Sequence, residues 1–137
     1  MRYMLDTDVC SYLMRRQDRR LLATMQTRVR SGAHLSISAI TYAELRLGAE
    51  RSSDPVKHHA IVGSLCERLS GIRAWDAEAA DVYARVQSAL LRAGTPIGNN
   101  DAMIGAHALS VGYVLVTNND RHFRNIEGLD IENWLDV

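Results

Sequence analysis

Short apolar runs alternate with stretches of helical periodicity along the whole chain. A short apolar run suits a buried strand, whereas apolar residues spaced three and four apart predict an amphipathic helix. Strands that alternate with helices are typical of parallel sheets, because a parallel crossover needs a dozen or more residues. The pattern therefore predicts an α/β fold, a three-layer α/β/α sandwich with a central, mainly parallel sheet and more helix than strand.

The expected elements follow from these patterns and from capping residues. We expect strands at residues 2–5, 34–37, 72–75, 113–117 and 129–131. We expect a short first helix capped by Thr7 or Asp8, and further helices at residues 18–30, 39–51, 55–69, 77–92, 101–111 and 121–125. The expected caps of the later helices are Ser38, Asp76 and either Asn99 or Asn100. No linker or repeat interrupts the pattern, so we expect residues 1–137 to form one domain.

The composition argues against several classes of protein. No apolar run approaches the roughly 20 residues of a membrane helix, and the N-terminus lacks the apolar stretch of a secretory signal, so we expect a cytoplasmic protein. The 16 basic side chains balance 16 acidic ones, which argues against a strongly basic nucleic-acid binder but not against a nuclease with an acidic centre. Cys10 and Cys66 fit no metal-binding spacing, and we expect both to be reduced.

Four acidic residues lie where an apolar run gives way to a helix or turn. Asp6 follows the first strand, and Glu44 lies one turn into the helix after the second. Asp101 opens a later helix, and Asp120 follows the strand at 113–117. Residues just past the strand ends of an open parallel sheet converge on one crevice. Because Mg²⁺ and Mn²⁺ prefer oxygen ligands, the acids predict a divalent metal site at that edge.

Each acid also has a purely structural explanation. Asp6 could cap the first helix, although Thr7 or Asp8 could do this instead. Glu44 could be a solvated side chain at the edge of the buried helix face, and Asp101 could simply complement the helix dipole. From the residues alone, both explanations stay open for all three acids.

The fourth position is the least defined. The Thr117 hydroxyl and the Asn119 amide could bind a water of the metal, and Asp120 could instead cap the short helix that follows. The five histidines have no zinc-like spacing. A glycine-rich phosphate loop, a Ser-His-Asp pattern and a catalytic cysteine signature are all missing from the sequence.

Several stretches, taken in order, resemble the PIN-domain family, and specifically the VapC-type toxin ribonucleases of bacterial toxin–antitoxin pairs. The matching stretches are residues 4–10 (MLDTDVC), 37–48 (ISAITYAELRLG), 94–108 (GTPIGNNDAMIGAHA), 115–123 (LVTNNDRHF) and 128–134 (GLDIENW). Each stretch alone is a weak signal. Together they span almost the whole chain in the right order, and this makes the resemblance specific.

The resemblance implies which residues form the site. Asp6, Glu44 and Asp101 correspond to the acidic, metal-binding positions of the family, where one or two Mg²⁺ ions, or Mn²⁺ in their place, would bind. Thr117 and Asn119 match the fourth motif of the family.

Two positions depart from the family pattern. Asp8 stands where relatives often have asparagine, beside the supporting Thr7. His122 stands where many relatives have an acid, and either Asp120 substitutes for that acid or the site uses three acids with Asn119.

By the same resemblance, we expect a metal-dependent endoribonuclease that acts as a toxin, cleaves tRNA or ribosomal RNA, forms a homodimer and binds a cognate antitoxin. Apolar residues of the first helices would suit a partner helix if they are exposed, or could pack on the core: Leu13, Met14, Leu22 and Met25. His122 favours one alternative, a catalytically degenerate PIN domain that acts as an RNA- or protein-binding module. A metal-dependent deoxyribonuclease is a third alternative, which substrate preference would distinguish.

Overall fold

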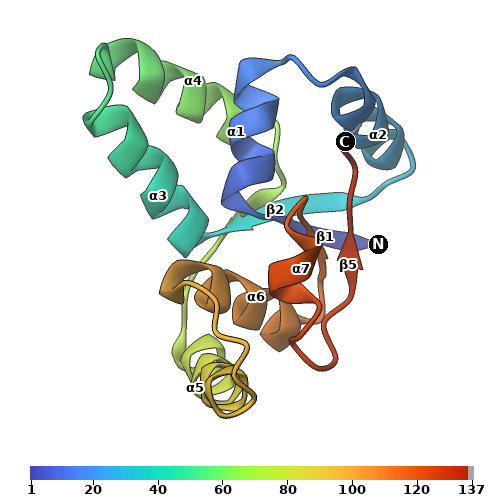
Figure 1. Cartoon of the computed structure of the whole chain (residues 1–137). Coiled ribbons are helices and arrows are strands. Elements are labelled where there is room, and N and C mark those ends of the chain that lie inside the picture. Colours follow the sequence, from blue (N-terminus) through green and yellow to red (C-terminus); the bar gives the residue numbers. More distant parts are fainter. Residues whose placement is uncertain (136–137) are drawn as a thin grey trace.

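The structure is a computed structural model that describes residues 1–135, and its centre is a parallel sheet (Figure 1). The sheet has the strand order β3-β2-β1-β4-β5, and every neighbouring pair is parallel. Its strands are β1 (Arg2–Leu5), β2 (His34–Ser38), β3 (Gly71–Arg73), β4 (Val114–Val116) and β5 (Ile131–Glu132). The prediction of a parallel α/β sheet is confirmed.

Helices cover both faces of this sheet. They are α1 (Thr7–Arg15), α2 (Arg19–Arg30), α3 (Ala39–Glu50), α4 (Pro55–Glu67), α5 (Ala77–Arg92), α6 (Asn99–Val111) and α7 (Asp120–Phe123). Helices α1, α2, α3 and α4 pack on one face of the sheet through one core cluster. Helices α5, α6 and α7 pack on the other face through a second cluster. Successive residues of β1 alternate between the clusters, with Tyr3 and Leu5 in the first and Met4 in the second. The predicted three layers are therefore present.

The predicted element boundaries differ from the structure by at most two residues. The strand at 2–5 and the helix at 77–92 have the predicted bounds. Ser38 and Asp76 cap their helices as expected, since their side chains accept hydrogen bonds from the amides of Ile40 and Ala79.

Two of the predicted caps are wrong. Asp6, rather than Thr7 or Asp8, caps α1, because Asp6 has the last extended backbone conformation (ψ 173°) before the helix. Helix α6 begins two residues earlier than expected, and its N-cap is Gly98 rather than Asn99 or Asn100. This earlier start places Asn100 and Asp101 together in the first turn of α6.

The apolar residues of the first helices pack on the core. Leu13 is fully buried, Met25 is 6% exposed, and Met14 and Leu22 are partly buried against the same cluster. Leu13 and Met25 are therefore too buried to meet a partner helix, whereas Met14 and Leu22 keep part of their surface exposed, so a partner surface at these two residues stays a prediction. The helical period of the sequence predicts which side of each helix is apolar, but not which residues pack against that side.

The two cysteines, one buried histidine and the character of the helices complete the description of the fold. Cys10 and Cys66 are free thiols, and Cys10 is buried. His107 of α6 is buried, and its Nδ1 lies 2.8 Å from the hydroxyl of Ser38. This contact fixes α6 against the end of β2. None of the helices in residues 1–135 has the length and apolar character to cross a membrane.

Candidate active site

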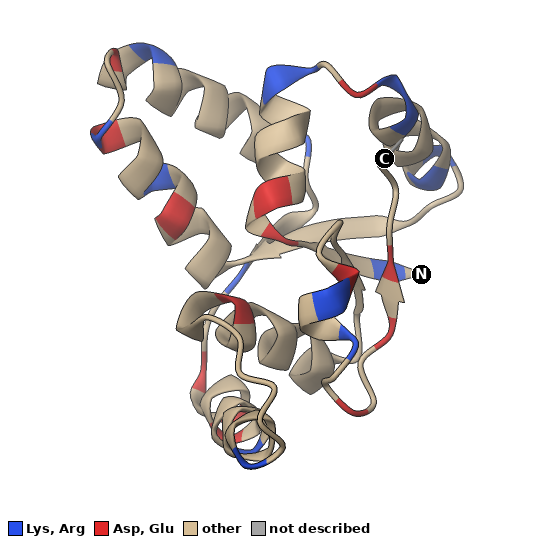
Figure 2. Ribbon diagram, in the orientation of Figure 1, with Lys and Arg blue, Asp and Glu red and all other residues tan. Residues whose placement is uncertain are grey.

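The carboxyl ends of the three central strands bring the candidate residues together. Asp6 follows β1, Thr117 follows β4, and α3 begins directly after β2 with Glu44 in its second turn. Parallel strands end at a common edge, where the first turns of their helices converge. Figure 2 shows acidic segments of α1, α3, α6 and α7 around this edge.

Asp6 is the most buried of these acids, with 2% of its surface exposed. Its Oδ1 accepts a hydrogen bond of 2.9 Å from the Val9 amide, and its Oδ2 accepts one of 2.5 Å from the Thr117 hydroxyl. Burial raises the pKa of Asp6 to about 6, these two hydrogen bonds oppose the rise, and the charges of Asp8 and Asp101 add to it.

Glu44 is held by residues from two other helices. Thr7 of α1 donates a hydrogen bond of 2.5 Å to Oε1 of Glu44, and Asn100 of α6 donates one of 3.1 Å to Oε2. The carboxylate therefore lies between α1 and α6, over the sheet edge. A solvated position on the outside of α3 is excluded.

Asp101 lies in the first turn of α6 and is half-buried. Burial raises the pKa of Asp101, the neighbouring His122 opposes the rise, and the charges of Glu44 and Asp8 add to it. The His122 Nδ1 lies 3.6 Å from Oδ2 of Asp101.

The fourth motif contributes an amide rather than an acid. Asn119 Nδ2 donates a hydrogen bond of 2.7 Å to Asp8, and the Asn119 amide donates one of 2.9 Å to the Thr117 hydroxyl. Asp120 is exposed in the first turn of α7, and its carboxylate makes no hydrogen bond or ion pair within residues 1–135. The structure thus brings Asp8 beside the other acids and leaves Asp120 apart from their network.

Sequence reasoning did not assign Asn100 to the site. The residue was expected only as a possible helix cap, although its position next to Asp101 was a usable signal. His122 was noted as a departure from the family pattern, but its contact with Asp101 was not foreseen.

The donor set fits a hard divalent cation. Asp6, Asp8, Glu44 and Asp101 supply only oxygen atoms, which Mg²⁺ and Mn²⁺ prefer. Within residues 1–135, no three His, Cys, Asp or Glu side chains are grouped closely enough to hold an ion as they stand. Neutral groups donate hydrogen bonds to the carboxylate oxygens of Asp6, Asp8 and Glu44 instead. Each carboxylate oxygen has a further lone pair that could bind a cation.

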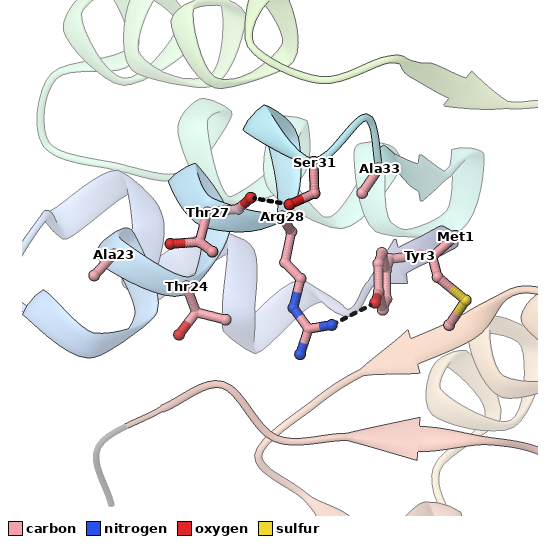
Figure 3. Close-up of a pocket in the computed structure, with 8 residues that line it drawn as sticks. All are labelled: Met1, Tyr3, Ala23, Thr24, Thr27, Arg28, Ser31 and Ala33. Carbon is pink, nitrogen blue, oxygen red and sulfur yellow. Dashed lines mark hydrogen bonds between the residues drawn. The ribbon is translucent and has the colours of Figure 1, made fainter.

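Two surface hollows help to delimit the site. One, of about 430 Å³, adjoins it between α1, α3 and α4, and its lining includes Thr7, Glu44 and Ile61. The other, of about 480 Å³, lies at the opposite edge of the sheet, where β1 begins (Figure 3). There Arg28 donates a hydrogen bond of 2.9 Å to the Tyr3 hydroxyl and pairs with Glu132 at 3.2 Å. This second hollow is separate from the acidic site.

The comparisons agree with this geometry. A family model described as PIN domain matches residues 3–129. The chain is 36% identical over 134 residues to a tRNA(fMet)-specific endonuclease VapC of Salmonella typhimurium, covering 98% of both proteins. It is 34% identical over 135 residues to Ribonuclease VapC2 of Haemophilus influenzae, covering 98% of this chain and 99% of that protein. The chain therefore belongs to the PIN-domain family, in its VapC branch.

Solved structures show the same similarity. VapBC2 of Rickettsia felis, bound to a DNA fragment from its promoter, matches with a TM-score of 0.92 and 30% identity, covering 98% of this chain and 99% of that one. DNA-bound VapBC of Salmonella typhimurium matches with a TM-score of 0.90 and 36% identity, covering 98% of both chains.

Proposed function

We propose that the protein is a metal-dependent endoribonuclease and the toxin of a toxin–antitoxin pair. The observation that carries the proposal is the gathering of Asp6, Asp8, Glu44 and Asp101 at the carboxyl ends of the central strands. Buried and crowded carboxylates are unfavourable unless a cation or proton meets them.

We assign the metal-binding role to Asp6, Glu44 and Asp101, with Mg²⁺ as the ion and Mn²⁺ as a substitute. A bound divalent ion would supply an activated water and would offset negative charge on the phosphodiester. The chain itself orients the ligands, because Thr117 holds Asp6 while Thr7 and Asn100 hold Glu44. Asn119 holds Asp8 toward the same region.

We propose tRNA as the first substrate class to test, with ribosomal RNA as the second. The support is the 36% identity to an endonuclease whose name specifies tRNA(fMet). Such RNAs lie in the cytoplasm, so action in the cytoplasm is part of the proposal. Matched solved structures are VapBC complexes, and a cognate antitoxin is therefore the proposed protein partner. Homodimerisation remains a prediction from family resemblance.

The experiment is incubation of the purified chain with total tRNA and ribosomal RNA, with Mg²⁺ or with EDTA. The Asp6→Asn variant tests the site, and Asp120→Asn is the control because the Asp120 carboxylate lies outside the network. Discrete cuts that require Mg²⁺, disappear in Asp6→Asn and persist in Asp120→Asn are expected.

Two outcomes would contradict the proposal. Cleavage that survives both EDTA and Asp6→Asn would exclude the carboxylate–metal site. No cleavage of any RNA by the folded, antitoxin-free chain would favour the degenerate binding module instead. The feature that favours this second candidate is the position of His122, whose Nδ1 lies 3.6 Å from a carboxylate oxygen of Asp101, a proposed ligand.

A further inference from the structure

Basic residues are concentrated at the end of α1 and along α2. Residues 9–43 contain one acid, Asp18, and these six arginines: Arg15, Arg16, Arg19, Arg20, Arg28 and Arg30. In Figure 2 basic segments lie at the turn between α1 and α2, whereas acidic segments surround the strand ends. A chain with no net charge thus carries a local excess of basic residues at the end of α1 and along α2.

Three arginines at this turn, Arg15, Arg16 and Arg19, form no ion pair with an acid in the described part of the chain. All three are exposed. Arg16 lies close to Arg68, where burial and the charge of Arg16 both lower the pKa of the Arg68 guanidinium. One arginine would be enough to complement the end of α1. Unpaired positive charges at close range indicate that the surface meets an anion.

One face of α1 connects this cluster to the acidic centre. Asp8, Tyr12 and Arg15 are spaced four and three residues apart and share that face. Asp8 is hydrogen bonded to Asn119 at the site, while the Arg15 guanidinium lies over the Tyr12 ring, 4.8 Å from its centroid. A hollow of about 350 Å³ adjoins Tyr12 and Arg19. Aromatic and arginine side chains next to an acidic centre are typical of a nucleic-acid surface.

We propose that this face of α1 and the turn into α2 bind the RNA backbone on one side of the cleaved bond. The inference rests on the proposed ribonuclease function and identifies where its substrate lies. Arg15, Arg16 and Arg19 bind successive phosphates, to which guanidinium groups donate paired hydrogen bonds. Tyr12 provides a ring on which a base stacks. We name this surface the α1 track.

The length of α1 sets the length of RNA that the track can bind. A nine-residue helix is roughly 13 Å long. Stacked nucleotides rise about 3.4 Å each along one strand, so this distance corresponds to about four nucleotides. RNAs that extend less than about four nucleotides from the acidic centre in the direction of the track should therefore lose the contribution of the arginines.

The test measures RNA binding separately from cleavage. The probe is a fluorescein-labelled single-stranded RNA of about 12 nucleotides, a length within the range that single-strand binding proteins cover. Anisotropy in EDTA gives Kd between about 50 and 200 mM salt. The test variant is Arg15→Gln/Arg16→Gln. The matched control is Arg85→Gln/Arg92→Gln, which removes the same charge from exposed positions of α5, on the other face of the sheet.

The test variant is expected to raise Kd on the order of tenfold at physiological salt. Two lost phosphate contacts should also reduce the slope of log K against log salt by about 1.4. The control should retain the wild-type Kd and slope, and Tyr12→Ala should weaken binding with little change of slope. Thermal unfolding of each variant shows that it is folded.

Several outcomes would overturn the inference. A test variant that binds RNA with the wild-type Kd and slope excludes the α1 track, even if the wild type cleaves RNA. A wild type that binds poly-glutamate more tightly than RNA shows that the surface is for an acidic protein segment. Conversely, arginine-dependent RNA binding without any Mg²⁺-dependent cleavage supports the track and contradicts the nuclease function. The two proposals are thus distinguishable.

Discussion

Thr117, the residue after β4, donates a hydrogen bond of 2.5 Å to Asp6, the residue after β1. Both side chains are buried, and the two strands are neighbours in the sheet. The same hydroxyl accepts a hydrogen bond from the Asn119 amide. A single buried threonine therefore fixes the orientation of the most buried carboxylate and the start of the loop that carries Asn119.

The first prediction concerns this hydroxyl. Thr117→Val keeps the side-chain shape but removes the donor to Asp6, and we expect the free energy of unfolding at neutral pH to fall by about 2 kcal/mol. The initial rate of RNA cleavage should fall at least about tenfold, because the carboxylate loses its fixed orientation. Thr117→Ser retains the hydroxyl and should lose much less activity. Equal losses in the two variants would show that packing, not the hydrogen bond, is responsible.

The second prediction concerns Asp6 and pH, in EDTA. Since burial raises the pKa of Asp6 from 3.8 to about 6, the folded state binds the proton more tightly than the unfolded state. The free energy of unfolding should therefore decrease as the pH rises from about 4 to 6. The amide side chain of the Asp6→Asn variant does not ionise, so it carries no buried charge at any of these pH values. The variant should therefore be more stable than the wild type above pH 6, by up to roughly 3 kcal/mol, and similar to it below about pH 4.

Urea unfolding of both proteins at several pH values measures this difference. A difference between variant and wild type that stays constant with pH would show that Asp6 is not titrating in this range. The expected result combines greater stability with the loss of nuclease activity in one substitution.

The third prediction concerns the proposed metal ligands. Glu44→Gln and Asp101→Asn should each weaken Mn²⁺ binding at least about tenfold, because each removes one anionic ligand. Asp8→Asn tests the acid that the structure places beside the others, and Asp120→Asn tests the acid that it leaves outside. Isothermal titration calorimetry with Mn²⁺ alone gives the affinities without any RNA. If Asp120→Asn binds Mn²⁺ more weakly than Asp8→Asn does, Asp120 is a metal ligand and the assignment of the site is wrong.

The fourth prediction concerns the packing of α6 against α7. A Cβ added at Gly105 would lie 2.7 Å from Cδ1 of Ile126 and 3.1 Å from the Phe123 ring. The end of the Ile126 side chain can move, but the fully buried Phe123 ring cannot move as easily. Gly105→Ala should therefore lower the free energy of unfolding by about 1–2 kcal/mol.

Gly63→Ala provides the matched control on α4, where an added Cβ meets nothing within 4 Å. It should raise the free energy of unfolding by up to about 1 kcal/mol, because alanine favours helix more than glycine does. Chemical denaturation measures both variants. A neutral Gly105→Ala would show that α7 moves aside at little cost.

Local patterns predicted most of the fold. The strand at 2–5 was predicted with the observed bounds because a short apolar run is a local signal, and the helix at 77–92 because Asp76 caps a stretch of helical periodicity. The position of Asp6 and Asp101 at one sheet edge followed from the parallel topology alone. The errors at the caps arose where adjacent polar residues compete for one position.

The pairing of side chains within the site could not be predicted in this way. Asn119 and Asp8 are 111 positions apart, and Asn100 and Glu44 are 56 apart. Where several helices converge, the spacing of residues in the sequence does not predict which side chain donates a hydrogen bond to which carboxylate. For the same reason the apolar residues of α1 and α2 were recognisable as a stripe, while their burial depended on the sheet and on α4.

The strand order has a consequence for protein synthesis. Strand β1 is made first, yet one of its two neighbours, β4, is among the last elements of the chain. A chain that is still emerging from the ribosome carries Asp6 and Glu44 long before Thr117 and Asn119 exist. A premature stop or an early proteolytic cut leaves an incomplete set of side chains that cannot assemble. The complete set of side chains at this site therefore exists only when translation of the message is almost finished.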